Sequence, residues 1–94
     1  MAINLEFDNY EEVISFIQRE KDLLFTETLN EIKESIKNDK KIANVANLMV
    51  NDSVISINVE KSDWALHLNV SIGYFQRIED YETCVEIRDI LKGL

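Results

Sequence analysis

The residues that could do chemistry are few and widely separated in this sequence. His67 is the single histidine and Cys84 the single cysteine. Asp63 lies four residues before His67, so on a helix the two side chains could supply half of the ligands of a metal site. No second histidine or cysteine stands at ligand spacing to complete it. Cys84 lies between Glu82 and Glu86, whose charges disfavour the thiolate that a nucleophile needs. We interpret His67 as a partly exposed helix residue and Cys84 as a small core residue at a helix crossing.

Two pairs of adjacent carboxylates, Glu11-Glu12 and Glu79-Asp80, are the other candidates for catalysis. Adjacent side chains diverge on a helix, so neither pair converges on a substrate, and both are typical of helix starts and turns. The two glycines stand apart, which excludes the glycine-rich phosphate loops. We therefore predict a protein that is not an enzyme and that has no metal site and no cofactor.

Composition bounds the protein further. The chain has 94 residues, 46% of them hydrophobic, which suffices for one core, and we expect a single domain over residues 1–94. Ten basic and eighteen acidic residues give a net charge of −8, which argues against direct nucleic-acid binding. No apolar stretch is long enough to span a membrane, and the first residues do not resemble an export signal. With a single thiol, these features indicate a cytoplasmic protein.

The acidic residues gather in two segments. Residues 6–12 hold four acidic side chains and no basic one, and residues 79–89 hold five acidic side chains against Arg88, so each segment has a net charge of −4. If the segments share a face, their field would steer association with a basic partner. The residues predicted to contact that partner are Glu79, Asp80, Glu82, Glu86 and Asp89, followed by Glu11 and Glu12.

Two other groups of residues suggest alternatives. The basic residues gather at Lys33, Lys37, Lys40 and Lys41, the one cluster that could line a nucleotide site. Four large amphipathic side chains would each be a candidate interface anchor if exposed, although most should belong to the core: Trp64, Tyr10, Tyr74 and Tyr81.

The first half of the chain predicts a strand followed by helix. Residues 2–7 alternate between apolar and polar side chains, as in a short strand. Asp8 or Asn9 then caps a helix. Apolar residues at helical spacing predict one long helix over residues 9–38, or two helices with a kink near residues 20–22. Residues 42–50 are ambiguous between helix and strand, and we favour a hairpin of 43–50 with 54–60 around a turn at 51–53.

The second half predicts two helices. Residues 64–72 fit both a strand alternation and a helical stripe, and we favour the helix because Ser62 and Asp63 look like a helix start. A turn at Glu79-Asp80 leads to a last helix over residues 81–92. The expected fold is α+β, with a small antiparallel sheet of about three strands packed against a long N-terminal helix and a C-terminal helical hairpin.

The segment from Gly73 to Asp89 reads GYFQRIEDYETCVEIRD. It is similar to small uncharacterised phage proteins that end in a YF–EDYE–C–IRD pattern, and it resembles more loosely the hairpin of tetratricopeptide repeats and the UVR motif of excision-repair proteins. In those motifs an aromatic residue packs between two helices, and a small residue, here Cys84, lets them approach. The resemblance covers about 20 of the 94 residues and implies a packing arrangement and a phage origin, and it carries no catalytic residue.

Three classes of function are therefore compatible with the sequence. The first is a small acidic binding protein, such as a phage or mobile-element inhibitor or adaptor, that occludes a basic surface on a host nucleic-acid enzyme or defence protein. The second is a homo-oligomeric structural or assembly protein, because the apolar stripe of the helix at 9–38 is wide. The third is a protein that sequesters a small ligand such as a nucleotide. We favour the first class.

Overall fold

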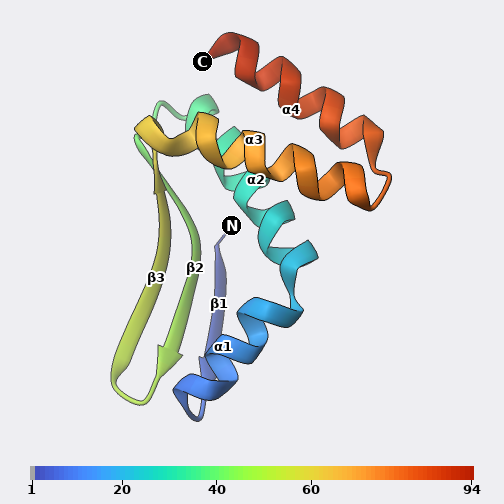
Figure 1. Ribbon diagram of the computed structural model, residues 1–94. Helices are drawn as coiled ribbons and strands as arrows, with labels where there is room; N and C mark the ends of the chain where they lie inside the picture. The colour runs from blue at the N-terminus through green and yellow to red at the C-terminus, as the bar shows by residue number, and fades with distance from the viewer. Residues whose placement is uncertain (1) are drawn as a thin grey trace. The chain divides into compact units, whose positions relative to one another are not determined.

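The computed structural model describes residues 2–94 and confirms the α+β class (Figure 1). The contacts divide the chain into two compact units, one ending at Glu60 and the other covering Lys61–Leu94. The single domain expected over residues 1–94 stays a prediction. The elements of the first unit, in order, are β1 (Ile3–Phe7), α1 (Tyr10–Arg19), α2 (Lys21–Lys37), β2 (Ile42–Val50) and β3 (Ser53–Glu60). The second unit contains a short 3-10 turn (Lys61–Asp63), α3 (Trp64–Arg77) and α4 (Tyr81–Gly93).

Within residues 2–60 the strands form one sheet in the order β1-β2-β3. The hairpin of β2 with β3 is antiparallel, as expected, but β1 pairs with β2 in parallel. The sheet is therefore mixed, which corrects the expectation of an antiparallel sheet. The reason is the connection: α1 and α2 carry the chain back along the sheet before β2 begins, and a crossover of this length permits a parallel neighbour.

A break at Glu20 divides the helical segment 9–38 into two helices, as one of the two predicted alternatives had it. Asn9 caps α1: its Oδ1 accepts a hydrogen bond from the Glu12 N–H at 3.0 Å, and Glu12 Oε2 accepts one from the Asp8 N–H at 3.2 Å. The Glu20 N–H closes the last turn of α1 on Phe16, while its carbonyl accepts from Leu24 to start α2. The two helices thus meet at a single non-helical residue.

The sheet has one covered face and one open face. Helix α2 packs on β2 with Leu29, Ile32 and Ser35 buried, and Figure 1 shows it beside the sheet. The ambiguity of residues 42–50 has a structural cause, a β-bulge between Asn44 and Ala46. Val45 and Ala46 are both buried, so the alternation of strand side chains is interrupted at that point.

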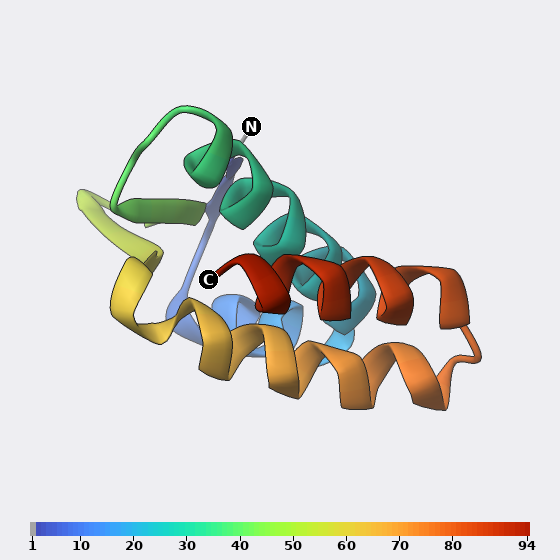
Figure 2. The ribbon, with the colours of Figure 1, turned by 90° about the horizontal axis from the view of Figure 1, so that it is seen from above.

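In the second unit, α3 and α4 lie side by side as a helical hairpin (Figure 2). Residues 64–72 are helical, as favoured. The buried residues of α3 are Trp64, Leu68, Ser71 and Phe75, which follow helical spacing, and those of α4 are Cys84 and Ile87. The Cys84 thiol lies 3.7 Å from the carbonyl oxygen of Ile72, so a small side chain stands where the helices approach each other.

Candidate functional site

One flank of α4 is acidic. Glu82, Glu86 and Asp89 follow each other at helical spacing, and all three are exposed. Successive residues of a helix are rotated by 100° about its axis, so these three carboxylates lie on one side of the exposed surface of α4. Arg88 and Lys92 lie on the other side. We call Glu82, Glu86 and Asp89 the acidic stripe. Lys92 Nζ lies 3.8 Å from an Asp89 carboxylate oxygen, with both side chains largely in solvent, so this ion pair is weak.

Val85 lies between the two flanks, and Tyr81 lies on the flank of Arg88 and Lys92. The exposed fractions of Tyr81 and Val85 are 60% and 55%, high for large apolar side chains one turn apart. The face of α4 thus combines two apolar side chains with carboxylates on one side. This combination is typical of an interface centre with a charged rim.

The other two carboxylates of the C-terminal segment have local structural roles. The Glu79 backbone adopts a left-handed conformation with φ 61°, and the N–H groups of Glu79 and Asp80 donate to the carbonyls of Gln76 and Phe75. This arrangement is a Schellman motif, which ends α3. Asp80 also starts α4, because its carboxylate accepts hydrogen bonds from the backbone and the hydroxyl of Thr83.

Glu11 and Glu12 lie in the first turn of α1, in the first unit, and both are exposed. Glu12 is engaged in the cap described above, whereas Glu11 is not part of it. The two acidic segments therefore belong to different units, and each is an acidic patch in its own right. Of the seven predicted contact residues, the acidic stripe brings three together on one helix face.

The four large amphipathic side chains divide between core and surface. Trp64 is buried and Tyr74 is partly buried, whereas Tyr10 and Tyr81 are more than half exposed. Tyr10 stands at the first position of α1 and Tyr81 at the first position of α4. Each tyrosine thus lies on the same helix as one of the acidic segments, and only these two qualify as interface anchors.

The candidate catalytic residues remain separate. His67 is exposed on α3, as interpreted, and Cys84 is buried, in agreement with its interpretation as a core residue at a helix crossing. Within residues 2–94, no three histidine, cysteine, aspartate or glutamate side chains gather in a way that would hold a metal ion.

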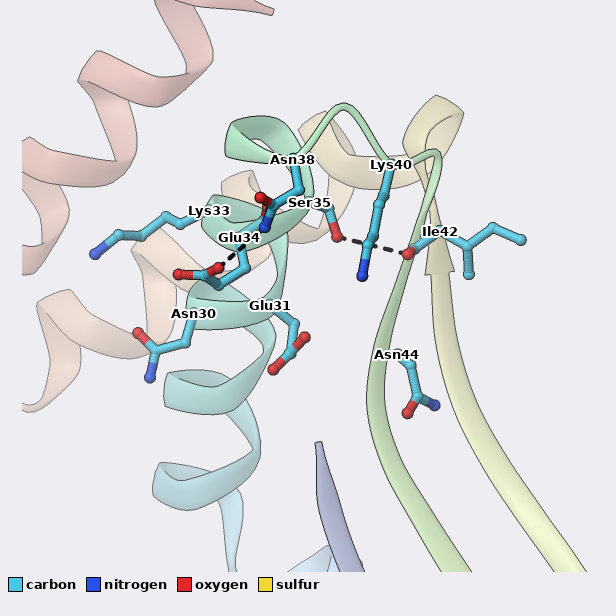
Figure 3. A pocket seen from close by; sticks show the side chains of 9 residues that line it. All are labelled: Asn30, Glu31, Lys33, Glu34, Ser35, Asn38, Lys40, Ile42 and Asn44. Atoms are coloured by element: carbon cyan, nitrogen blue, oxygen red, sulfur yellow. Dashed lines mark hydrogen bonds between the residues drawn. The ribbon is translucent and has the colours of Figure 1, made fainter. Parts of the chain in front are cut away.

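A pocket of about 680 Å³ lies between the second half of α2 and the start of β2 (Figure 3). The Schellman motif at the end of α2 places Lys40 there, since the N–H groups of Asp39 and Lys40 donate to Ile36 and Ser35. Figure 3 shows the Lys40 and Glu31 side chains directed into the space between α2 and β2, and Lys33 directed away from β2. The lining residues are Asn30, Glu31, Lys33, Glu34, Ser35, Asn38, Lys40, Ile42 and Asn44.

The residues that line this pocket show whether the lysine cluster could form a nucleotide site. Lys33 and Lys40 line it, but Lys37 and Lys41 do not. Two carboxylates, from Glu31 and Glu34, line it as well, so a polyphosphate would meet as many negative as positive groups. The lining does not favour a nucleotide.

A pair of half-buried carboxyl groups stands one turn apart on α2. Burial raises the pKa of Glu27 above its usual value, and a hydrogen bond with the Glu31 side chain raises this pKa further. One carboxylate oxygen of each residue is removed from solvent. This pair of side chains was not singled out in the sequence, although the spacing of four residues on a helix was its signal.

The open face of the sheet carries a network of amide side chains that the sequence pattern also did not reveal. Asn47 donates to Asn4 at 3.0 Å and exchanges hydrogen bonds with Asn44 at 3.0 and 3.1 Å. Asn44 donates to Asn58 at 2.7 Å, and the Ser56 hydroxyl donates to Asn47 at 3.0 Å. The network crosses all three strands. Its signal in the sequence was the presence of asparagine at outward positions of each strand.

Comparisons of the chain with protein-family models, curated proteins and solved structures found no match. Among residues 2–94 no helix combines the length and the apolar character that crossing a membrane requires.

Proposed function

We propose that this chain is a non-enzymatic protein-binding module that docks the α4 face on a basic surface of a partner protein. The observation that carries the proposal is the acidic stripe of Glu82, Glu86 and Asp89 beside the exposed Tyr81 and Val85. Tyr81 and Val85, the apolar pair, supply apolar surface that is buried on binding. The carboxylates orient the partner and speed its association.

The proposed mechanism is occlusion. A basic groove that normally holds nucleic acid would accept the acidic stripe in place of phosphates, and the apolar pair would then keep the groove closed. The partner class is a host nucleic-acid enzyme or defence protein in the cytoplasm, in line with the phage resemblance of residues 73–89. The net charge of −8 supports attraction to such a partner over a distance of about 10 Å at 0.1 M salt.

The seven acidic residues carry this function unequally. Glu82, Glu86 and Asp89 lie on the exposed face of α4 and form the primary contact. Asp80 and Glu12 serve mainly as caps, and Glu79 serves the turn between the two helices. Glu11 is the remaining secondary candidate, on the other unit.

The experiment is an affinity capture from host lysate at low and at high salt with the full chain as bait. We expect a basic nucleic-acid enzyme or defence protein to be retained at low salt and lost at high salt. The variant Glu82→Lys/Glu86→Lys/Asp89→Lys should lose it at both. The control Glu6→Lys/Asp8→Lys/Asp52→Lys changes the net charge equally, at exposed positions of the first unit. Retention of the partner by the α4 variant, or equal loss from the control, would overturn the proposal.

A further inference from the structure

Within residues 2–60, strand β3 forms an edge of the sheet. It pairs with β2 on one side and ends the strand order of the described residues, as Figure 1 shows. It is eight residues long, and residues 53–59 contain no proline and no charged side chain. Proteins usually protect an exposed edge with lysine, proline or a short strand. The other edge, β1, has five residues and carries Glu6. Within residues 2–60, no strand pairs with the outward side of β3.

The side chains of β3 restrict which strand can pair with it. Ile55, Ile57 and Val59 lie on the covered face of the sheet, opposite the buried positions of β2, and Ser56 and Asn58 lie on the open face. A partner strand must likewise place apolar side chains on the covered face and polar side chains on the open face. A second β3, related by a two-fold axis perpendicular to the sheet, does so in any antiparallel register that is centred on a residue.

Charge and hydrogen bonding select one of these registers. A register centred on Ser56 would place Asp52 opposite Glu60 of the second copy, which brings like charges together. A register centred on Ile57 avoids this and places Ser56 opposite Asn58 of the second copy. Ile57 then faces its own counterpart, and Ile55 faces Val59 of the second copy.

The open-face side chains are complementary in this register. Asn58 Oδ1 accepts from Asn44 at 2.7 Å, so the Asn58 N–H groups are not needed for that bond and can donate elsewhere. The Ser56 hydroxyl donates to Asn47 at 3.0 Å, so its oxygen lone pairs can accept. Asn58 of each copy can donate to Ser56 of the other, and the amide network continues across the edge.

We propose that β3 pairs with β3 of a second copy of this chain, antiparallel and centred on Ile57, to form a dimer with one continuous sheet. Because each chain has a net charge of −8 and residues 55–59 at the centre of the pairing carry none, salt screens the repulsion without weakening the contact. The dimer should therefore strengthen with salt, whereas binding of a basic partner by α4 should weaken.

The first experiment measures dimerisation of the full chain by sedimentation equilibrium at 50 and 500 mM NaCl. We expect a dimer whose dissociation constant falls with salt. Asn58→Asp keeps the acceptor for Asn44, removes the donors to Ser56 and adds a charge, so it should weaken dimerisation by about tenfold or more. The matched control Asn4→Asp makes the same change in the same network at the other edge, and it should retain the dimer. A monomer at both salt concentrations, or equal effects of the two variants, would overturn the proposal.

The second experiment tests the register by cross-linking under mild oxidation. Ile57→Cys should form a disulfide-linked dimer, because the two positions face each other across the axis. Val54→Cys is the control: it is exposed on the same strand but lies far from its own counterpart in this register. Should Ile57→Cys fail to fold, a mixture of Ser56→Cys and Asn58→Cys chains tests the same register by forming the mixed dimer. Cross-linking through Val54→Cys, or none through either central design, would contradict the register.

Discussion

The carboxylate of Asp80 accepts two hydrogen bonds from Thr83, one from the backbone N–H at 3.2 Å and one from the hydroxyl at 2.7 Å. Asp80 is also the residue whose N–H closes the end of α3 on Phe75 at 2.8 Å. One residue thus ends the first helix of the hairpin and starts the second. The sequence suggested that the Asp80 carboxylate contacts a partner, but in the structure this carboxylate caps α4.

The first prediction concerns this cap. Asp80→Ala should lower the free energy of unfolding by about 1 kcal/mol, because the first turn of α4 loses its acceptor. Asp80→Asn keeps an acceptor oxygen and loses the charge, so it should cost less. Urea denaturation of both variants against the unmodified chain measures the difference. Equal losses in the two variants would show that the charge, and not the cap, matters for stability.

The second prediction concerns the left-handed residue that precedes this cap. Glu79 has φ 61°, a conformation that costs a residue with a Cβ about 1 kcal/mol relative to glycine. Glu79→Gly should therefore raise the stability by up to about that amount, although it removes a charged side chain. Thermal unfolding would show a higher midpoint. Glu82→Gly, in the first turn of α4, is the control and should lower the midpoint, because glycine is unfavourable in a helix.

The helix over residues 64–72 shows how far sequence reasoning reaches. The strand interpretation required Leu66 and Val70 to be buried with Trp64 and Leu68, but both are more than half exposed. The spacing of four residues between Trp64 and Leu68 indicated the helix correctly. The alternation of apolar and polar residues over 64–72 did not reflect the structure. Local features such as the Asn9 cap, the break near residue 20 and the turn at Glu79-Asp80 were predicted because each depends on a few neighbouring residues.

Features that depend on distant residues were not predictable. The parallel pairing of β1 places Asn4 opposite Asn47, 43 residues away, and nothing local specifies that register. The bulge at Val45 shifts the outward positions of β2, so the positions of Asn44 and Asn47 on the open face do not follow from simple alternation. The amide network and the edge of β3 became visible only once the strand order was known.

The third prediction concerns pH. Burial raises the pKa of Glu27 in the folded state, so the neutral form is favoured by folding. The stabilisation is fully present below the ordinary value of 4.5 and is lost as the pH rises through the raised pKa. Glu27→Gln should be more stable than the unmodified chain at neutral pH, and the difference should shrink at pH 4. Urea midpoints at several pH values test this. Glu6→Gln, at an exposed position of β1, is the control. A difference between Glu27→Gln and the unmodified chain that does not vary with pH would contradict the assignment.

The last prediction concerns the centre of the amide network. Asn47 bonds to Asn4, Asn44 and Ser56, so it joins β1 to β3 through β2. Asn47→Ala should lower the free energy of unfolding by about 1–2 kcal/mol, because several half-buried hydrogen bonds are lost together. Asn4→Ala removes one of these bonds at the edge and should cost less. In a double-mutant cycle the pair should show coupling of about 0.5 kcal/mol or more, since the two side chains are directly bonded. Strict additivity in that cycle would mean that solvent replaces the Asn4–Asn47 bond without loss, and that β1 is held to β2 by its backbone pairing and by its apolar contacts on the covered face alone.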